Sequence, residues 1–400
     1  MSQGSPGKNH EQPVSITHTE DASSHQQGPD IFQEQGNPLE DHPSIKRKAK
    51  KKTCPYQVHS LFKGSLGITH YKLEGPEDGE LVIGFHGLNG TRSTWQGAAK
   101  DLIAIGYQVL TYDLYGHGLS SCPPFDVFGG YTYTPQFFVD QLDELLVHLK
   151  LQDRSCSLIA FSLGALIACS FACKHMNLVL RLILVSPAGM LEHRPRSISA
   201  IMTCECLIPC SPCCVCRCCF NRKSFMDRCS SDDCASGAAQ VMWDRIMWNL
   251  FDKRGTIPAF LGAVTRLPIW NGHDIYRKLG RTGIAILLLW GSTDTVVPVH
   301  IATTMLEELN NCHLIVFPGC THLLLSERAN ECTALVATFL EFPKNAKLDD
   351  FHYLLPFTAE GEYRPPRSRC PPSMRQEVFF DLISYRPKRW FKVRSPKTNR

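Results

Sequence analysis

One serine of the chain stands in a pattern that is typical of a nucleophile. Ser162 follows a short apolar run of strand length, residues 158–161, and precedes residues 163–168, whose composition suits a buried helix. Small residues, Ala160 and Gly164, stand two positions before and two positions after it. A sharp strand–turn–helix connection needs small side chains there, and it exposes the serine oxygen at the end of the sheet. The pattern therefore predicts that Ser162 attacks an electrophilic carbon.

A histidine and an aspartate farther along the chain could activate this serine. A serine hydroxyl is a weak nucleophile at neutral pH and needs a neighbouring base. Asp294 follows the apolar run at residues 284–290, and His322 follows the run at residues 314–317. Both runs indicate strands, so the two residues are expected at the sheet edge where Ser162 lies. We expect His322 to accept the serine proton and Asp294 to orient the imidazole ring.

Five short motifs in a fixed order carry a resemblance to a known family. They are HGLNG at residues 86–90, DLYGHGLS at 113–120, AFSLGA at 160–165, GSTDTVVP at 291–298 and PGCTH at 318–322. With these motifs the chain resembles the α/β-hydrolases over about residues 65–340, and in particular the lid-containing, monoacylglycerol-lipase-like esterases. The one departure from the G-x-S-x-G pattern is Ala160 in the first position, and alanine also meets the demand for a small side chain.

The resemblance implies which groups stabilise the negative charge of a tetrahedral intermediate. The family places one backbone N–H donor directly after the nucleophile and another in the HG-x loop, and these positions are Leu163 and Leu88. His86, Gly87 and Asn89 are then expected to form the pocket loop, with His86 holding it by hydrogen bonds and Asn89 adding a side-chain donor. This chemistry needs no cofactor, and we assign no metal ligand.

Two further polar residues follow the predicted strand at residues 107–112. We interpret Asp113 as a carboxylate that organises its own loop. We interpret His117 as a structural residue, or as one near the pocket. Neither is expected to act as the base.

The alternation of strands and helices predicts an α/β fold. We expect the α/β-hydrolase fold, with a mostly parallel central sheet flanked by helices and a helical cap insertion. Strands are predicted at residues 65–73, 81–85, 107–112, 158–161, 180–185, 284–290 and 314–317. Helices are predicted at residues 94–105, 134–149, 163–168 and 323–339.

The same alternation divides the chain into five regions. The strand–helix rhythm stops at residue 190 and resumes at residue 284, and the segment between carries two helical stretches, residues 238–251 and 257–264. In this fold an insertion at that point usually forms a lid. The regions are a disordered N-terminal part with a basic run (1–52), the first part of the core (53–189), a Cys-rich cap (190–283), the second part of the core (284–342) and a basic, Pro-rich extension with one or two docked segments (343–400).

A dense cysteine cluster distinguishes the cap. Eight of the chain's 19 cysteines lie within residues 204–219. Neighbouring apolar and basic residues favour S-acylation, which we assign to Cys213, Cys214, Cys216, Cys218 and Cys219. Zinc binding is a weaker alternative because the C-x-x-C pairs are too crowded to define one tetrahedral set. The third alternative is an unstructured thiol-rich loop.

Charge and hydropathy limit the partners and the compartment. The net charge of +4 divides into −6 for residues 1–45, +6 for 46–52, −5 for 53–363 and +9 for 364–400. A mildly acidic body with basic ends does not suggest a nucleic-acid enzyme, but it allows contact with an anionic membrane through the cap cysteines and the basic segments. No apolar signal region or membrane-length run is visible, so we expect a cytoplasmic protein with peripheral membrane association.

Together with the resemblance, these observations predict a serine hydrolase of the EC 3.1 type. It would cleave carboxylic esters or thioesters, in particular those of lipids or acyl groups, through an acyl-enzyme. Two alternatives remain. One is a catalytically idle, membrane-attached scaffold that keeps the hydrolase fold. The other is an acyltransferase.

Overall fold

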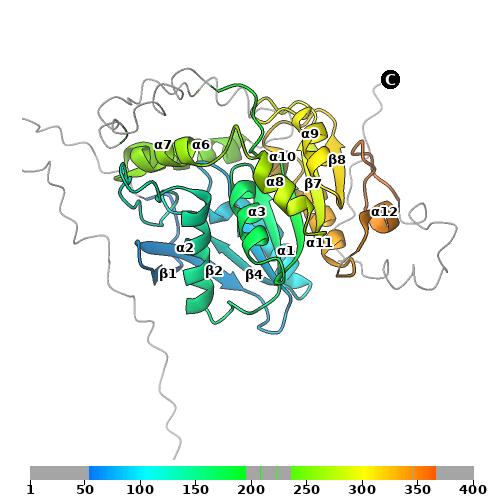
Figure 1. Cartoon of the computed structure of the whole chain (residues 1–400), viewed down its shortest axis with the longest axis horizontal. Coiled ribbons are helices and arrows are strands. Elements are labelled where there is room, and N and C mark those ends of the chain that lie inside the picture. The colour runs from blue at the N-terminus through cyan, green and yellow to red at the C-terminus, as the bar shows by residue number, and fades with distance from the viewer. Residues whose placement is uncertain (1–53, 195–207, 209–221, 223–235, 345, 366–400) are drawn as a thin grey trace, which may run out of the picture. The chain divides into compact units, whose positions relative to one another are not determined.

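An eight-stranded sheet forms the centre of the described chain (Figure 1). The computed structural model describes residues 54–194, 208, 222, 236–344 and 346–365. The strand order is β1-β2-β4-β3-β5-β6-β7-β8. The strands are β1 (Ser60–Lys63), β2 (Ile68–Glu74), β3 (Leu81–Phe85), β4 (Gln108–Tyr112), β5 (Cys156–Phe161), β6 (Val179–Val185), β7 (Ala285–Gly291) and β8 (Cys312–Phe317). β1 and β2 pair in antiparallel fashion, and all pairs from β4 to β8 are parallel.

The central strands are apolar throughout because helices cover both faces of the sheet. Every residue of β3 and β7 is buried. Successive side chains point to opposite faces, so Leu158 and Leu288 join one hydrophobic cluster while Ile159 and Leu287 join the other. A continuous apolar run is the pattern expected of a strand that is buried on both sides. The predicted α/β architecture with a mostly parallel sheet is confirmed.

Each hydrophobic cluster contains the apolar face of its own set of helices. One face of the sheet is covered by α2 (Pro135–His148), α3 (Gly164–Lys174), α8 (His273–Gly280) and α9 (Ile301–Glu308). The other is covered by η1 (Arg92–Trp95), α1 (Gln96–Ala104), α10 (Leu324–Glu327) and α11 (Ala329–Leu340). The start of α2 follows the sequence prediction, with Pro135 in the first turn and the Thr134 hydroxyl accepting the Phe137 amide at 3.3 Å.

Within residues 190–283 the described part is helical. It contains α6 (Ser236–Phe251), α7 (Thr256–Arg266) and α8, and the first two agree with the predicted stretches. The two ends of the segment meet, because the Leu191 amide donates to the Ile269 carbonyl at 3.1 Å. α6 is fastened to the core through Arg245, which donates to the Ser93 hydroxyl at 3.0 Å, and its end is fastened through Lys253, which donates to the His117 carbonyl at 3.1 Å.

Three details differ from the sequence prediction. The first strand begins at Ser60, before the start at residue 65 that was predicted for the first strands, and β1 and β2 form a hairpin. The predicted helix at 323–339 is divided at Arg328 into α10 and α11. The helix α8 was not predicted; it is short and amphipathic, with Asp274 in its first turn and basic residues in its last.

The beginning of the C-terminal extension packs on the outer strand. It forms α12 (Leu348–Phe351) and η5 (His352–Leu354), and Leu355 is fully buried. The Val316 amide of β8 donates to the Ala359 carbonyl at 2.8 Å, so this segment covers part of the sheet edge. The predicted disordered region at 1–52 and the tail beyond residue 365 lie outside the described residues. In the part of the chain that the structure describes, no helix is long and apolar enough to cross a membrane.

Candidate active site

The turn between β5 and α3 has the geometry that the sequence predicted. Ser162 has a φ of 52°, which is unusual for a residue with a side chain, and it is held by its amide, which donates to the Val185 carbonyl at 2.9 Å. A Cβ added at Gly164 would lie 2.5 Å from the His86 carbonyl oxygen. Only glycine therefore allows α3 to pass so close to the end of β3. A strained, close-packed turn of this kind presents its serine oxygen at the sheet edge.

A continuous hydrogen-bond chain joins the serine to a histidine and an aspartate. The Ser162 hydroxyl lies 3.0 Å from Nε2 of His322, and Nδ1 of His322 lies 2.8 Å from Oδ2 of Asp294. The Asp294 side chain is fully buried, and the His322 side chain is mostly buried. Since Nδ1 donates to the carboxylate, Nε2 is left as an acceptor that faces the serine hydroxyl. The structure thus brings together the three residues that the sequence placed after separate strands.

The second carboxylate oxygen of Asp294 fixes the orientation of the Asp294 side chain within this series of hydrogen bonds. Oδ1 accepts the amides of Val296 and Val297 at 2.9 and 2.8 Å. The loop that carries Asp294 is tied to the loop that carries His322, because the Thr293 amide and hydroxyl both donate to the Cys320 carbonyl, at 2.9 and 2.8 Å. The relative position of the acid and the histidine is therefore set by backbone contacts.

Glu327 supports the histidine loop, and sequence reasoning did not identify it. Its two carboxylate oxygens accept the amide and the hydroxyl of Thr321, each at 2.7 Å. These bonds hold the turn that presents His322, whose ring packs against Phe161 with centroids 5.0 Å apart. The one signal in the sequence that could have indicated this contact is that Glu327 follows Thr321 by only six residues. The break between α10 and α11 follows directly after Glu327.

The HG-x loop passes directly over the serine turn. A Cβ on Gly87 would lie 3.1 Å from Cβ of Ser162 and 3.0 Å from the Phe161 ring, so a side chain here would have to displace its neighbours slightly. His86 is fully buried; its Nδ1 contacts the Gly87 carbonyl at 2.8 Å, and its Nε2 accepts the Leu114 amide at 3.0 Å. The side chain of His86 therefore links this loop to the loop after β4. Asn89 adopts a φ of 57°, which turns the chain at this point.

The two amides assigned to charge stabilisation remain predictions. Leu163 is the buried N-cap residue of α3, and Leu88 is the second residue after His86 in the loop. Among the described residues, neither amide donates to another backbone group in the turns and loops around the site. The oxyanion role of both amides therefore stays a prediction.

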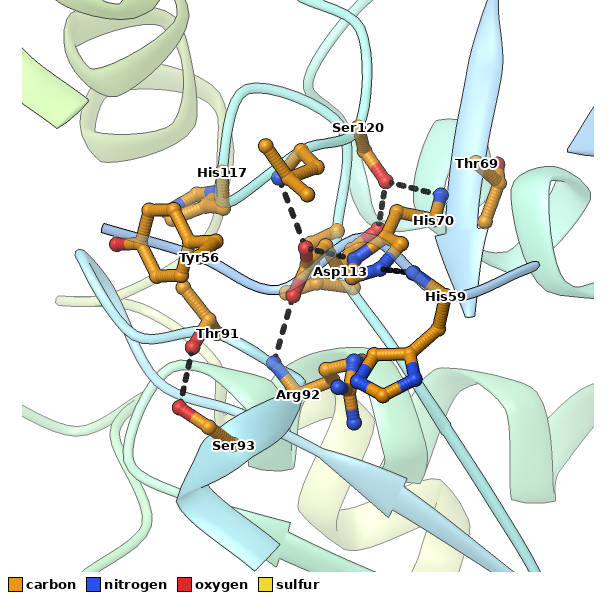
Figure 2. A network of polar contacts seen from close by, with 12 residues as sticks. Tyr56, His59, Thr69, His70, Thr91, Arg92, Ser93, Asp113, His117 and Ser120 are labelled. Atoms are coloured by element: carbon orange, nitrogen blue, oxygen red, sulfur yellow. Dashed lines mark hydrogen bonds and ion pairs between the residues drawn. The ribbon is translucent and has the colours of Figure 1, made fainter. Parts of the chain in front are cut away.

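Asp113 is the centre of a buried polar network beside the loop (Figure 2). Its Oδ2 lies 2.8 Å from Nδ1 of His70 and accepts the Leu119 amide at 2.8 Å, while its Oδ1 accepts the Arg92 amide at 2.7 Å. The carboxylate thus joins β2, its own loop and the end of the HG-x loop. Sequence reasoning assigned it a loop-organising role, but the partner His70 was missed because it lies on another strand.

Burial controls the charge of the residues around this network. Burial alone would raise the pKa of Asp113, but the hydrogen bond and charge of His70, together with the Arg92 amide, lower the pKa to about 2. Burial lowers the pKa of His117 to about 3, and burial also lowers the pKa of His86. Both histidines are therefore neutral at pH 7. His117 packs edge-on against His86, with ring centroids 5.1 Å apart, which places it among the structural residues.

The described part of the chain also contains a groove away from this site. A groove at the opposite edge of the sheet includes Tyr107 and Arg181, but Tyr107 donates to Glu341 at 2.6 Å and Arg181 donates to Glu80 at 2.7 Å. No group of three or more potential metal ligands occurs among the described residues. The cysteines assigned to S-acylation, Cys213 to Cys219, lie outside the described residues.

Comparisons with known proteins agree with this architecture. Residues 76–210 match the family model described as serine aminopeptidase, S33, and residues 268–350 match the model described as TAP-like protein. ABHD8 of Mus musculus is 24% identical over 272 residues, which are 67% of this chain and 56% of that protein. The chain thus spans little more than half the length of ABHD8. The proline iminopeptidase PfmaB of Pestalotiopsis fici is 22% identical over 284 residues, which are 68% of this chain and 95% of that protein.

Solved structures share the same fold. The esterase EaEST of Exiguobacterium antarcticum superimposes with a TM-score of 0.56 at 19% identity, covering 71% of this chain and 100% of the esterase. A thermophilic esterase from Thermogutta terrifontis gives a TM-score of 0.55 at 19% identity, covering 70% of this chain and 97% of the esterase. With its sheet order, serine turn and family matches, the chain belongs to the α/β-hydrolase superfamily.

Proposed function

We propose that the chain is a serine hydrolase that cleaves carboxylic esters or thioesters through a covalent acyl-enzyme. The observation that carries this proposal is the hydrogen-bond chain from Asp294 through His322 to the hydroxyl of Ser162. This site combines a buried carboxylate, an oriented imidazole and a serine in a strained turn. A purely structural role does not require these three groups in hydrogen-bond contact. The esterases and the peptidase among the similar proteins also favour hydrolysis.

In this mechanism Nε2 of His322 takes the proton as Oγ of Ser162 forms a bond to the carbonyl carbon. Asp294 stabilises the imidazolium, and the Leu88 and Leu163 amides receive the negative oxygen. Collapse of the intermediate breaks the bond to the leaving group, which receives the proton from His322. Water then loses a proton to His322 and attacks the acyl-serine, which releases the acid and restores the hydroxyl.

The narrower form of the proposal is a lipid or acyl ester substrate, including monoacylglycerol-type esters. Its support is the insertion after β6, whose helices α6 and α7 contact the loops that follow β3 and β4, and the cysteine cluster within that insertion. S-acylated cysteines and the basic segments would bring this side of the protein to a membrane. Replacing the clustered cysteines by serine is then expected to reduce the membrane-bound fraction of the protein.

Hydrolysis of a panel of acyl esters and acyl thioesters tests the proposal. The purified chain should release acid from at least one chain length, and Ser162→Ala should reduce kcat by about a million-fold, to the background rate. The matched control is Ser170→Ala. Ser170 lies eight residues after Ser162, and its hydroxyl donates to the Leu166 carbonyl within α3. Equal hydrolysis by wild type and Ser162→Ala would refute the proposed mechanism.

The same assay separates the two alternative functions. A catalytically idle scaffold would show no turnover of any ester while remaining folded and membrane-bound. An acyltransferase would form a new ester when glycerol or another alcohol is added, so the ratio of acid to transferred product decides between water and an alcohol as acceptor. The hydrogen bonds that join Asp294, His322 and Ser162 favour a hydrolase over an idle scaffold.

A further inference from the structure

The helix α6 is joined to the loops beside the active site by polar and aromatic contacts. Its side chains Met247 and Leu250 are buried, but neither belongs to the two hydrophobic clusters that cover the faces of the sheet. The contacts with the loops come instead from Arg245 and, just after the helix ends, from Lys253. The position of α6 on these loops therefore depends on a small number of directional contacts.

Arg245 contacts the end of the HG-x loop. Its Nη1 donates to the Ser93 hydroxyl at 3.0 Å, and that hydroxyl lies 2.7 Å from the hydroxyl of Thr91, which is buried (Figure 2 shows the pair Thr91 and Ser93). Ser93 follows directly on the segment that carries the Leu88 amide and passes over Ser162. Arg245 thus ties α6 to the loop in which an oxyanion donor is predicted.

Tyr56, in the segment before β1, holds Arg245 from the other side. Its hydroxyl donates to the Arg245 carbonyl at 3.4 Å, and the Arg245 guanidinium lies 5.7 Å from the centre of its ring. The same ring meets Trp248 edge-on, with centroids 5.5 Å apart. Burial raises the pKa of Tyr56, so its hydroxyl stays protonated and can donate. Tyr56 therefore contacts both the backbone and the side chain of Arg245.

The segment that carries Tyr56 is itself anchored to the buried network of Asp113 (Figure 2). The His59 amide donates to Nε2 of His70 at 3.0 Å, and Nδ1 of His70 lies 2.8 Å from Oδ2 of Asp113. The other oxygen of Asp113 accepts the amide of Arg92, the residue before Ser93, at 2.7 Å. The segment before β1, the helix α6 and the end of the HG-x loop thus form a closed ring of contacts that begins and ends at one carboxylate.

We propose that Tyr56 and Arg245 are positioning residues that couple α6 to the HG-x loop, so that the Leu88 amide has its hydrolytic position only while α6 is docked. The effect on catalysis rests on the proposed function, whereas the effect on the loop does not. Neither residue touches the reacting atoms in this proposal. Hydrolysis would then depend on the position of a helix of the insertion after β6, which is separate from the support that His86 gives to the same loop.

Hydrogen exchange tests the coupling without any substrate. The amides of Gly90 and Thr94 each donate within the loop at 2.9 Å, so peptides that cover residues 86–95 report its opening. Arg245→Met keeps most of the length of the side chain but removes its donors, and it should speed exchange in these peptides by about tenfold. Ser93→Ala should have the same effect. Arg254→Met, which changes an exposed arginine after α6, should have none. Unchanged exchange in both Arg245→Met and Ser93→Ala would overturn the proposal.

Steady-state ester hydrolysis tests the consequence for catalysis. Tyr56→Ala and Arg245→Met should each lower kcat by about tenfold with little change in KM, because the oxyanion donor acts in the transition state. Tyr56→Phe keeps the ring contacts and should restore most of kcat. The double variant of Arg245→Met and Ser93→Ala should lose no more than Arg245→Met alone, since both changes remove one bond.

The outcomes separate this proposal from the function on which it rests. Wild-type kcat in Arg245→Met, or losses that add fully in the double variant, would overturn the coupling. A wild-type chain that hydrolyses no ester would instead refute the proposed function, and hydrogen exchange would then decide alone whether α6 holds the loop.

Discussion

At the scale of single residues, Asp294 uses its two carboxylate oxygens for different tasks. One oxygen binds Nδ1 of His322, and the other accepts two backbone amides. Asp294→Asn keeps the shape of the side chain. When its amide N–H faces Nδ1 of His322, however, Nδ1 must accept, and the proton moves to Nε2, which can then no longer take the serine proton. We expect kcat to fall by about ten-thousand-fold with little change in KM. Steady-state kinetics measure the effect, and the exposed Asp274→Asn, whose partner is Arg277, is the control.

A fall of tenfold or less in Asp294→Asn would contradict the assigned role. Thermal unfolding of both variants is needed in parallel, because Asp294 also holds its own loop. A variant that unfolds at the wild-type temperature but has lost activity separates the orientation of His322 from the stability of the loop.

Asp113 predicts a change of stability with pH. Its pKa falls from an ordinary 3.8 to about 2 in the folded protein, which corresponds to about 2 kcal/mol of stability. Because the folded pKa is the lower one, this stability is fully present above pH 4 and is lost as the pH falls from about 4 to about 2. Asp113→Asn should destabilise the protein at pH 7 by about 2–4 kcal/mol, since its amide would face buried N–H donors.

Urea unfolding at pH 7 and at pH 3 checks this prediction. The difference in stability between wild type and Asp113→Asn should be smaller at pH 3 than at pH 7. An equal difference at both pH values would mean that folding does not lower the pKa of this carboxyl, and a larger difference at pH 3 would mean that folding raises it. A neutral carboxyl at this position would leave His70 without its anionic partner.

The sequence could identify the reacting residues because each stands in a recognisable local pattern. Ser162, Asp294 and His322 follow apolar runs, and small residues surround the serine. The supporting residues could not be found in this way. His70 reaches Asp113 across 43 positions, and Glu327 binds Thr321 in a turn that local helix propensity does not reveal. Such contacts depend on which strands and loops become neighbours after folding.

At the scale of elements, the close approach of α3 to β3 determines the serine turn. Gly164→Ala would place a Cβ against the carbonyl oxygens of His86 and Phe85, at 2.5 and 2.9 Å, so the helix must move. We expect a loss of stability of about 1–3 kcal/mol and a much larger loss of activity, because the displacement moves Ser162 away from His322. Chemical unfolding and ester hydrolysis measure the two effects.

The matched control is a glycine in another helix. A Cβ on Gly97, within α1, would meet no atom within 4 Å. Gly97→Ala should therefore stabilise the protein by about 0.5–1 kcal/mol and leave hydrolysis unchanged. A Gly164→Ala variant that retains wild-type stability and activity would show that the turn tolerates a side chain, against the steric argument.

The elements themselves were predictable where one physical signal dominates. Apolar runs defined the buried strands within one or two residues, as for β3 and β7. The first hairpin was misplaced because β1 is short and only partly buried, so it lacks a clear hydrophobic pattern. Residues 195–207, 209–221 and 223–235, which include most of the cysteine-rich segment, lie outside the description, and the predictions made for them stay predictions.

At the scale of the whole molecule, the C-terminal segment protects the last strand of the sheet. Phe357 is almost fully buried and packs against Phe317 with centroids 5.5 Å apart. Phe357→Ala should destabilise the protein by about 3–4 kcal/mol and expose the edge of β8 to pairing with other chains. The unfolding free energy and the aggregated fraction in size-exclusion chromatography measure both consequences.

Phe128→Ala is the control for this change, since that ring is fully exposed. Its effect on stability should stay within about 0.5 kcal/mol. If Phe357→Ala were equally mild, the C-terminal segment would not contribute to the folded core. The sequence predicted that one or two segments of the extension dock on the core. It did not predict that the docking site is β8, because a polar, proline-rich sequence has no hydrophobic periodicity from which a packing partner could be inferred.

Reaction with a fluorophosphonate probe tests the central claim most directly. The probe forms a covalent bond to a serine oxygen only when a neighbouring base activates the hydroxyl. We predict a single adduct on the folded wild-type chain, located at Ser162 by peptide mass mapping. The adduct should be absent in Ser162→Ala and strongly reduced in His322→Ala. A folded wild-type protein that forms no adduct, or forms it at another serine, would contradict the account.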